Sequence, residues 1–246
     1  MAGWGRILWF GAILLVLAMS RGSYGPRTRQ ALARHIYVDT APILWGFSLL
    51  CALLTMVITR IVVVTAASYG LSQYALEMVV RVLVLELIPL TAALFVALRC
   101  TIPNGAALSE MRRTGRFDAL RAGGQDPVLT EVLPRMLAGV FSTITLAALS
   151  CAVAIVLAYL AVYGFTLAGA AGYTRMFGHV FDGATSVIFA LKTLLFSLAV
   201  SVITMASGLY DIEGDGSRES AALQGLVRMF AVLLVLEGIS LVGNYY

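Results

Sequence analysis

The feature that most constrains the fold is Met136–Tyr163, a run of 28 residues without a charged side chain. A helix needs about 20 apolar residues to cross a bilayer, so this run is long enough to span it with some tilt. The remaining sequence has the same character, because hydrophobic residues make up 60% of the chain and charged residues only 12%. Soluble domains carry roughly 25% charged residues. We therefore predict an all-α integral membrane protein.

Four further apolar runs, separated by polar turns, are also long enough to span a membrane. We expect one domain covering residues 1–246, with the first span opening after Pro42. The predicted transmembrane segments are 43–67, 79–98, 136–163, 184–206 and 221–242.

The N-terminal region, residues 1–42, precedes these spans. Its apolar run Ile7–Met19 is shorter than the ~20 residues of a spanning helix, which leaves a signal peptide, a short anchor or an interfacial helix as alternatives. Trp4 and Trp9 suit a helix at the level of the lipid headgroups, and no clean small-x-small cleavage site follows. We favour the interfacial helix.

Basic residues orient the chain. Arg21–His35 contains four arginines and no acid, so we read it as a linker on the cytoplasmic side and place the N-terminus there. The charged insert Arg99–Arg135, between the second and third predicted spans, then also lies in the cytoplasm, and the C-terminus lies outside.

Charged residues inside the predicted spans are costly and mark paired or functional sites. They are Arg60, Glu86, Lys192 and Glu237. At ~1.5 Å per residue, all of them fall roughly 7–12 Å below the outer surface, and so in one layer. Two interpretations stay open: ion pairs that only hold the helices together, or a polar rim above an apolar cavity that accepts a charged headgroup.

Catalytic and metal-binding patterns are missing from the sequence. His35 and His179 are predicted on opposite sides of the membrane, and the three cysteines are widely spaced within or beside apolar runs. No nucleophile elbow, zinc-protease motif or Walker A loop is present. We therefore expect a non-catalytic chain without a cofactor of its own, in which any ATP is bound by another protein. A net charge of +4 gives no reason to expect a nucleic-acid partner.

Several landmarks nevertheless resemble a known family. They are Glu86–Leu94 (ELIPLTAAL) followed by Arg99, then Asp118-Ala119-Leu120, Asp126-Pro127 and Pro134–Val140 (PRMLAGV). In kind and spacing this series resembles the MlaE/YrbE permease family, and the resemblance covers roughly residues 30–246.

The resemblance implies the permease subunit of an ABC transporter that moves phospholipids or similar hydrophobic molecules between the bacterial inner membrane and the outer envelope. It implies a dimer of permeases with N-terminal interfacial helices, cytoplasmic ATPases and a periplasmic hexamer of an MCE-domain protein. Residues 105–124 would form the cytoplasmic coupling helix. The charges available for docking there are Glu110, Arg112, Arg113, Arg116 and Asp118.

Matching positions also imply a lipid-binding cavity. Tyr69 and Glu86 fall where the family lines its cavity, Lys192 matches a family lysine, and Glu237 stands where a family member has an acid. Arg60 joins this set through its predicted depth.

Departures from the family pattern concern the coupling block above all. Ala107 and Gly115 stand where glutamates are usual, and Ile88 replaces the glycine before Pro89. One hypothesis is a divergent subunit that forms a heterodimer with a related permease rather than a homodimer. The alternative function is a membrane scaffold or assembly subunit that transports nothing itself.

Overall fold

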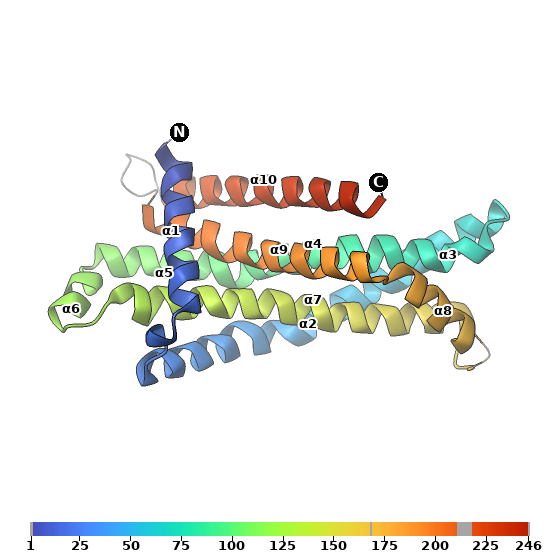
Figure 1. The fold of residues 1–246 in the computed structure, drawn as a ribbon, viewed down its shortest axis with the longest axis horizontal. Helices are drawn as coiled ribbons and strands as arrows, with labels where there is room; N and C mark the ends of the chain where they lie inside the picture. Colours follow the sequence, from blue (N-terminus) through green and yellow to red (C-terminus); the bar gives the residue numbers. More distant parts are fainter. Residues whose placement is uncertain (1, 168, 211–217, 246) are drawn as a thin grey trace.

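The computed structural model describes residues 2–167, 169–210 and 218–245, and all regular structure among them is helical (Figure 1). Five stretches are long and apolar enough to cross a membrane: Pro26–Ser68, Tyr74–Arg113, Val128–Tyr163, Gly183–Leu209 and Leu223–Gly243. A shorter apolar helix, α1 (Ala2–Met19), precedes them. The predicted all-α membrane class, with five spans after a short N-terminal apolar helix, is confirmed.

The first span belongs to a single long helix, α2 (Pro26–Ser68), which follows a short 3-10 turn, η1 (Arg21–Ser23). The expectation of a linker over Arg21–His35 was wrong from Pro26 onward, because this proline occupies the first turn, where its missing N–H costs nothing. Pro42 lies inside the helix rather than opening it. A stripe of side chains four residues apart buries α2 against the bundle, chiefly along α7: Ile43, Phe47, Cys51, Thr55 and Thr59.

Prolines also shape the next two spans, each of which contains wide π-helical turns. The second stretch comprises α3 (Ser72–Val79), π segment η2 (Val80–Leu87), α4 (Ile88–Val96), π segment η3 (Ala97–Thr101) and α5 (Ile102–Arg113). The third begins with π segment η4 (Val128–Val132) and continues as α7 (Leu133–Tyr163).

All three π segments end two residues before a proline, namely Pro89, Pro103 and Pro134. A proline inside a helix offers no N–H to the carbonyl four residues earlier, and its ring clashes with that carbonyl. A wider turn relieves the clash and lets carbonyls find donors five residues on. The π segments are therefore the local response to these prolines.

The predicted coupling helix, 105–124, is two helices in the structure. It divides between α5 and α6 (Arg116–Ala122), with Gly115 at the break in a left-handed conformation, φ 71°. Glycine adopts this conformation without steric cost, whereas the glutamate usual in the family would be strained there. The departure from the family pattern at Gly115 thus has a structural counterpart, which is a turn.

The helices pack side by side, apart from α1. In Figure 1, α10 (Arg218–Tyr245) lies along one side and α2 along the other, with α9 (Gly183–Tyr210), α4 and α7 between them. The helix α1 runs across this bundle and packs on α9 (Figure 1). Helices α5 and α6 mark one end of the bundle, here named the α5–α6 end (Figure 1). The opposite end carries α3 and α8 (Ala170–Val180) and is named the α3–α8 end (Figure 1).

Small residues allow α9 to approach its neighbours closely at the α5–α6 end. A Cβ added to Gly208 on α9 would lie 2.6 Å from the carbonyl oxygen of Gly105 on α5. A Cβ added to Gly225 on α10 would lie 2.7 Å from the Cβ of Ser207. The Arg112 guanidinium adds a hydrogen bond of 2.6 Å to the carbonyl of Leu209. Helix α5 is therefore firmly attached to the end of α9.

Replacement of Gly208 by alanine tests this attachment. Because the added methyl group meets backbone rather than a movable side chain, α5 and α9 must separate, at a cost of about 1–3 kcal/mol. We expect a lower Tm for the detergent-purified protein. Gly238→Ala is the control, since nothing lies within 4 Å of a Cβ there and alanine favours a helix. Equal Tm values for the two variants would contradict the close crossing.

Candidate functional site

Three of the four charged residues predicted within the spans meet in one buried cluster, the Glu86–Lys192–Glu237 triad. Lys192 comes from α9, Glu86 from η2 and Glu237 from α10. The ammonium Nζ of Lys192 contacts Glu86 Oε2 and lies 2.8 Å from Glu237 Oε2. The Lys192 side chain is only 2% exposed, so the two ion pairs are largely shielded from the surroundings. The triad connects three spans through one amine.

The backbone of the second span completes the surroundings of Lys192. Nζ also donates a hydrogen bond of 3.2 Å to the carbonyl of Leu85, in the π segment η2. In an α-helix this carbonyl would accept from the residue four positions on, but that residue is Pro89, which has no N–H. The proline therefore leaves an acceptor available where the amine needs one.

An aromatic ring covers the same amine. The Phe196 ring, one turn further along α9, is fully buried, and its centroid lies 5.6 Å from Nζ. This distance permits a cation–π attraction. With both carboxylates ionised, the triad has one more negative than positive charge. Such a group binds and orients other charges, but it contains no nucleophile paired with a base and so has no evident means of covalent catalysis.

Arg60, the fourth predicted charge, lies apart from the triad. Ile58 and Val62 of α2 pack against the cluster that includes η2, whereas Arg60 is exposed. Arg60 is two residues from each of them, and ~200° of helical rotation separates such positions. Arg60 therefore faces away from Glu86. The sequence analysis grouped the four residues by their depth along the helices. Arg60 does not join the other three because it lies on a different face of its helix.

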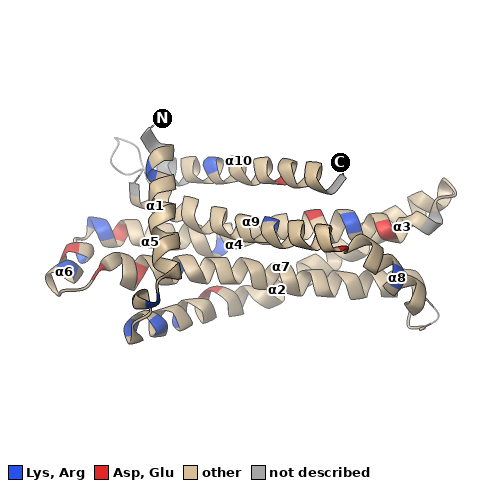
Figure 2. Cartoon of the chain, in the orientation of Figure 1, with Lys and Arg blue, Asp and Glu red and all other residues tan. Residues whose placement is uncertain are grey.

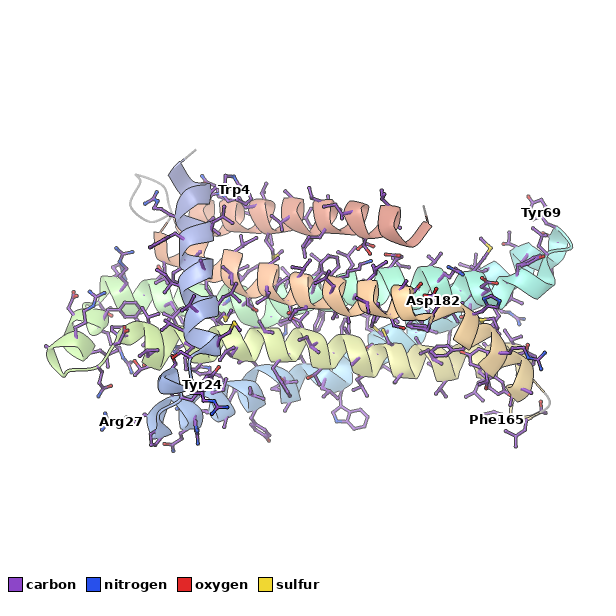
Figure 3. All side chains as sticks on the ribbon, in the orientation of Figure 1. Trp4, Tyr24, Arg27, Tyr69, Phe165 and Asp182 are labelled. Atoms are coloured by element: carbon purple, nitrogen blue, oxygen red, sulfur yellow. The ribbon has the colours of Figure 1, made fainter. Side chains whose placement is uncertain are left out.

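Tyr69 lies at the tip of the α3–α8 end, where Figure 3 shows it labelled beyond the end of α2. It follows the last residue of α2, and 76% of it is exposed. Its assignment to a lipid cavity stays a prediction, as do those of Arg60 and the triad residues.

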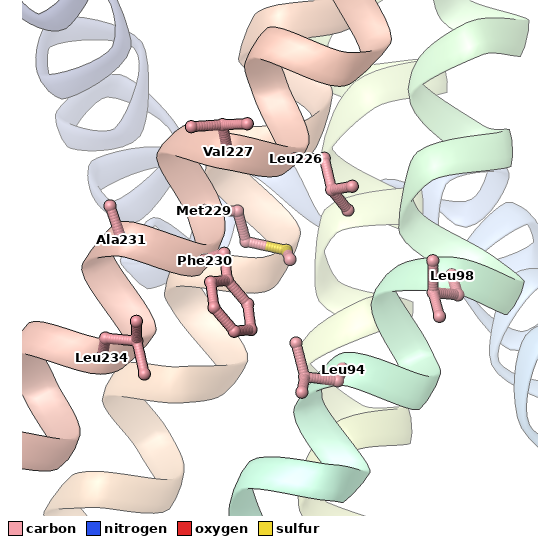
Figure 4. A pocket seen from close by; sticks show the side chains of 8 residues that line it. All are labelled: Leu94, Leu98, Leu226, Val227, Met229, Phe230, Ala231 and Leu234. Atoms are coloured by element: carbon pink, nitrogen blue, oxygen red, sulfur yellow. The ribbon is translucent and has the colours of Figure 1, made fainter.

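An apolar groove lies on the same two spans that supply the two carboxylates. It has a volume of about 480 Å³ and opens between α4 with η3 on one side and α10 on the other (Figure 4). Its lining is Leu94, Leu98, Leu226, Val227, Met229, Phe230, Ala231 and Leu234. Leu234 precedes Glu237 by less than one helical turn. A polar cluster and an apolar groove therefore follow one another along α10.

The predicted coupling residues divide into two groups. Arg112 is exposed but donates a hydrogen bond to the carbonyl of Leu209, so it belongs to the attachment of α5 to α9. The others lie at or near the surface: Arg113 pairs with Glu110 at 2.9 Å, and Asp118 pairs with Arg121 at 3.3 Å. Arg116 lies 3.9 Å from Glu131. The α5–α6 end thus offers both charge signs to a partner.

Further polar contacts that the sequence analysis did not single out tie α2 and α7 to this end. Asn104 of α5 donates a hydrogen bond of 2.9 Å to the Asp39 carboxylate of α2, and Arg135 pairs with Glu131 at 2.6 Å. The spacing of four residues between Glu131 and Arg135 is a helical ion-pair signal that was available in the sequence. Nothing local predicts the contact of Asp39 with Asn104, which are 65 residues apart.

Charges are distributed unequally between the two ends. Figure 2 shows most of the basic residues near α5, α6 and the first turns of α2, with few near α3 and α8.

At the α3–α8 end, the Asp182 carboxylate accepts a 2.7 Å hydrogen bond from the Thr185 N–H, which lowers the pKa of Asp182. Burial raises the pKa of Tyr173 on α8 to about 12.

The cysteines form no disulfide among the described residues. Cys51, Cys100 and Cys151 are buried free thiols, as predicted for small hydrophobic residues. Within the ranges the structure describes, no three side chains of His, Cys, Asp or Glu gather closely enough to hold a metal ion.

Loss of the amine tests the energetics of the triad. In Lys192→Met, two carboxylates remain buried together without a cation, which we expect to destabilise the protein by about 3–5 kcal/mol. The triple variant Lys192→Met, Glu86→Gln, Glu237→Gln leaves no unpaired charge and should recover part of that loss. Thermal unfolding of the purified protein measures both, with Arg175→Met on the exposed surface of α8 as control. A triple variant no more stable than Lys192→Met would mean that packing, not charge, dominates the site.

Comparison with known proteins agrees with this architecture. A chain from Rickettsia felis described as "Probable ABC transporter permease protein" is 27% identical over 172 residues, which cover 68% of this chain and 66% of that one. A similarly described protein of Rickettsia prowazekii is 26% identical over the same coverage. The matches thus span about two thirds of the relatives' length. The family described as "Permease MlaE" matches residues 32–242, nearly all of the helical bundle, and the chain therefore belongs to the MlaE permease family.

Proposed function

We propose that this chain is the transmembrane subunit of an ABC transporter that moves phospholipid, or a similar hydrophobic molecule, between the inner membrane and the outer envelope. The observation that carries the proposal is the succession of the triad and the apolar groove along α10. An amphiphile needs both environments, one for a charged headgroup and one for its acyl chains.

Access to the triad requires movement of α10. Glu237 is the most exposed residue of the triad, with 14% of its side chain exposed, whereas the Lys192 side chain is only 2% exposed. A headgroup phosphate is a competing acceptor for the Lys192 amine, so a lipid that reaches the triad exchanges one ion pair for another. A reversible contact between α9 and α10 is therefore the element through which binding and release are controlled.

Energy for this movement has to come from a partner, because the sequence contains no nucleotide-binding motif. The relatives are named as ABC transporter permeases, and such permeases work with an ATPase. The exposed charges of α5 and α6 form the docking surface in this proposal. Since α5 is attached to α9 at Gly208, and Lys192 lies about 24 Å along the same helix, a displacement of α5 reaches the triad through one rigid element.

Orientation and assembly complete the proposal. The gathering of basic residues at the α5–α6 end supports a cytoplasmic location for that end and for the N-terminus, by the positive-inside rule. We further propose a second permease as the dimer partner, identical or related, and an MCE-domain hexamer at the α3–α8 end. A scaffold subunit without transport activity remains the alternative, and it has no need of an ATPase.

Lipid transfer separates these functions. In vesicles containing the purified complex, we expect Glu86→Gln and Lys192→Met to reduce ATP-dependent transfer of labelled phospholipid at least tenfold, because each removes a charge at the proposed headgroup site. Co-purification of the ATPase with the folded fraction of each variant should remain unchanged, since the proposed docking surface is intact. Wild-type transfer by both variants would leave the triad as a purely structural ion pair. Absence of any ATPase from the wild-type complex would favour the scaffold.

Charge reversal tests the docking surface. The Asp118 side chain is 78% exposed, so Asp118→Arg leaves the fold intact while it opposes the existing surface charge. We expect loss of most of the co-purifying ATPase, measured by quantitative mass spectrometry of the tagged complex. Arg29→Glu, on the exposed first turns of α2 at the same end of the bundle, is the control for a general charge effect. Equal ATPase recovery from Asp118→Arg and wild type would place docking elsewhere.

A further inference from the structure

A second groove lies on the opposite side of α2 from the triad, between α2 and α7. Its volume is about 530 Å³. Its lining is Met56, Val57, Thr59, Arg60, Ile61, Val63 and Ala161. Most of these side chains are apolar, and Met56, Val57 and Ile61 are exposed on the surface that a bilayer would cover. The groove therefore opens toward lipid rather than toward the interior of the bundle.

Arg60 is the charged member of this groove. Among the described residues, no carboxylate forms an ion pair with it, in contrast to Lys192 and to Arg81, which pair with neighbouring acids. Arg60 precedes the end of α2 by eight residues, which places its Cα about 12 Å along the helix from that end. A long arginine side chain extends from such a depth toward the headgroup region. Within the described parts of the chain, the guanidinium is thus a donor without a carboxylate partner.

Thr59 adds a second free donor to the same groove. Several other threonines in the spans satisfy their hydroxyls with the carbonyl four residues earlier, as Thr55 does with Cys51 and Thr204 with Val200. The hydroxyl of Thr59 is buried and finds no hydrogen-bond partner among the residues that the structure describes. A buried hydroxyl without a hydrogen bond costs free energy. A small movement that brings a ligand oxygen within hydrogen-bonding distance of Thr59 would recover that cost.

We propose that this groove binds a membrane lipid with an anionic head, whose phosphate is held by Arg60 and whose acyl chain lies against Met56, Val57 and Ile61. Arginine suits this role because its planar guanidinium presents several donors to one phosphate. An unpaired positive charge favours lipids of net negative charge over zwitterionic ones. The site lies outside the proposed transport route, and its occupancy needs neither ATP nor an ATPase.

Photocrosslinking inside the groove identifies the occupant. The full-length chain, with a benzophenone amino acid in place of Ile61, is reconstituted in phosphatidylcholine vesicles that contain phosphatidylglycerol as the minor component. Mass spectrometry of the crosslinked peptide then counts the two lipids. We expect phosphatidylglycerol to be enriched about fivefold over its share of the bilayer, the ratio that corresponds to one basic side chain beside an anionic lipid.

Matched variants make the result specific. Arg60→Gln should reduce the enrichment to the bulk ratio. Arg175→Gln should keep it, because it removes the same charge from the same end of the molecule but outside the groove. Ala161→Phe fills the groove without a change of charge and should reduce crosslinking to both lipids. Unchanged enrichment in Arg60→Gln would overturn the proposal, as would crosslinks to a protein in place of lipid from membranes of the producing cells.

These outcomes are independent of the transport proposal. Failure of the Arg60 variants to alter crosslinking leaves lipid transfer by the triad untouched. Conversely, loss of all transfer in the Glu86 and Lys192 variants does not affect occupancy of the α2–α7 groove. The triad joins η2, α9 and α10, whereas the groove lies between α2 and α7, and different measurements test the two sites.

Discussion

Lys192 donates a hydrogen bond to the carbonyl of Leu85. This carbonyl lacks its usual helical donor, because the residue four positions on is Pro89, which has no N–H. Inside a bilayer no water is available to satisfy a freed carbonyl, so each proline in a span creates a demand that the protein must meet. This chain meets part of the demand with π-helical turns and part with the ammonium of a neighbouring span. The ammonium of Lys192 thus serves this freed carbonyl together with the carboxylates of Glu86 and Glu237.

Helix α9 is the element on which the remaining organisation converges. At one end, Ser207 and Gly208 bring α5 and α10 nearly to backbone contact, and Ser201 packs against Gly139 of α7. Towards the other end, Lys192 holds η2 and α10 by charge. The first set of contacts is rigid because it consists of backbone and small side chains. The second can be broken by a competing ion, so a single helix combines a fixed and a switchable attachment.

The sequence was sufficient for the class, the five spans and the shared depth of Glu86, Lys192 and Glu237, because apolar length and depth along a helix are local properties. It was insufficient where a contact depends on the face of a helix or on a partner residue far away in the sequence. Depth grouped Arg60 with the triad, although the buried stripe through Thr55 and Thr59 shows that Arg60 faces elsewhere. The break at Gly115 and the crossing of Gly105 with Gly208 depend on backbone conformation and on residues far apart in the chain. Local sequence patterns therefore do not predict these contacts.

Helix α2 is long enough to connect the two ends of the bundle. Its 43 residues extend about 65 Å, roughly twice the thickness of the hydrocarbon core of a bilayer. The helix is therefore longer than a perpendicular crossing requires, and its basic first turns lie at the α5–α6 end (Figure 1). Since Asp39 joins this part of α2 to Asn104 of α5, one continuous helix connects the α5–α6 end to the Arg60 groove.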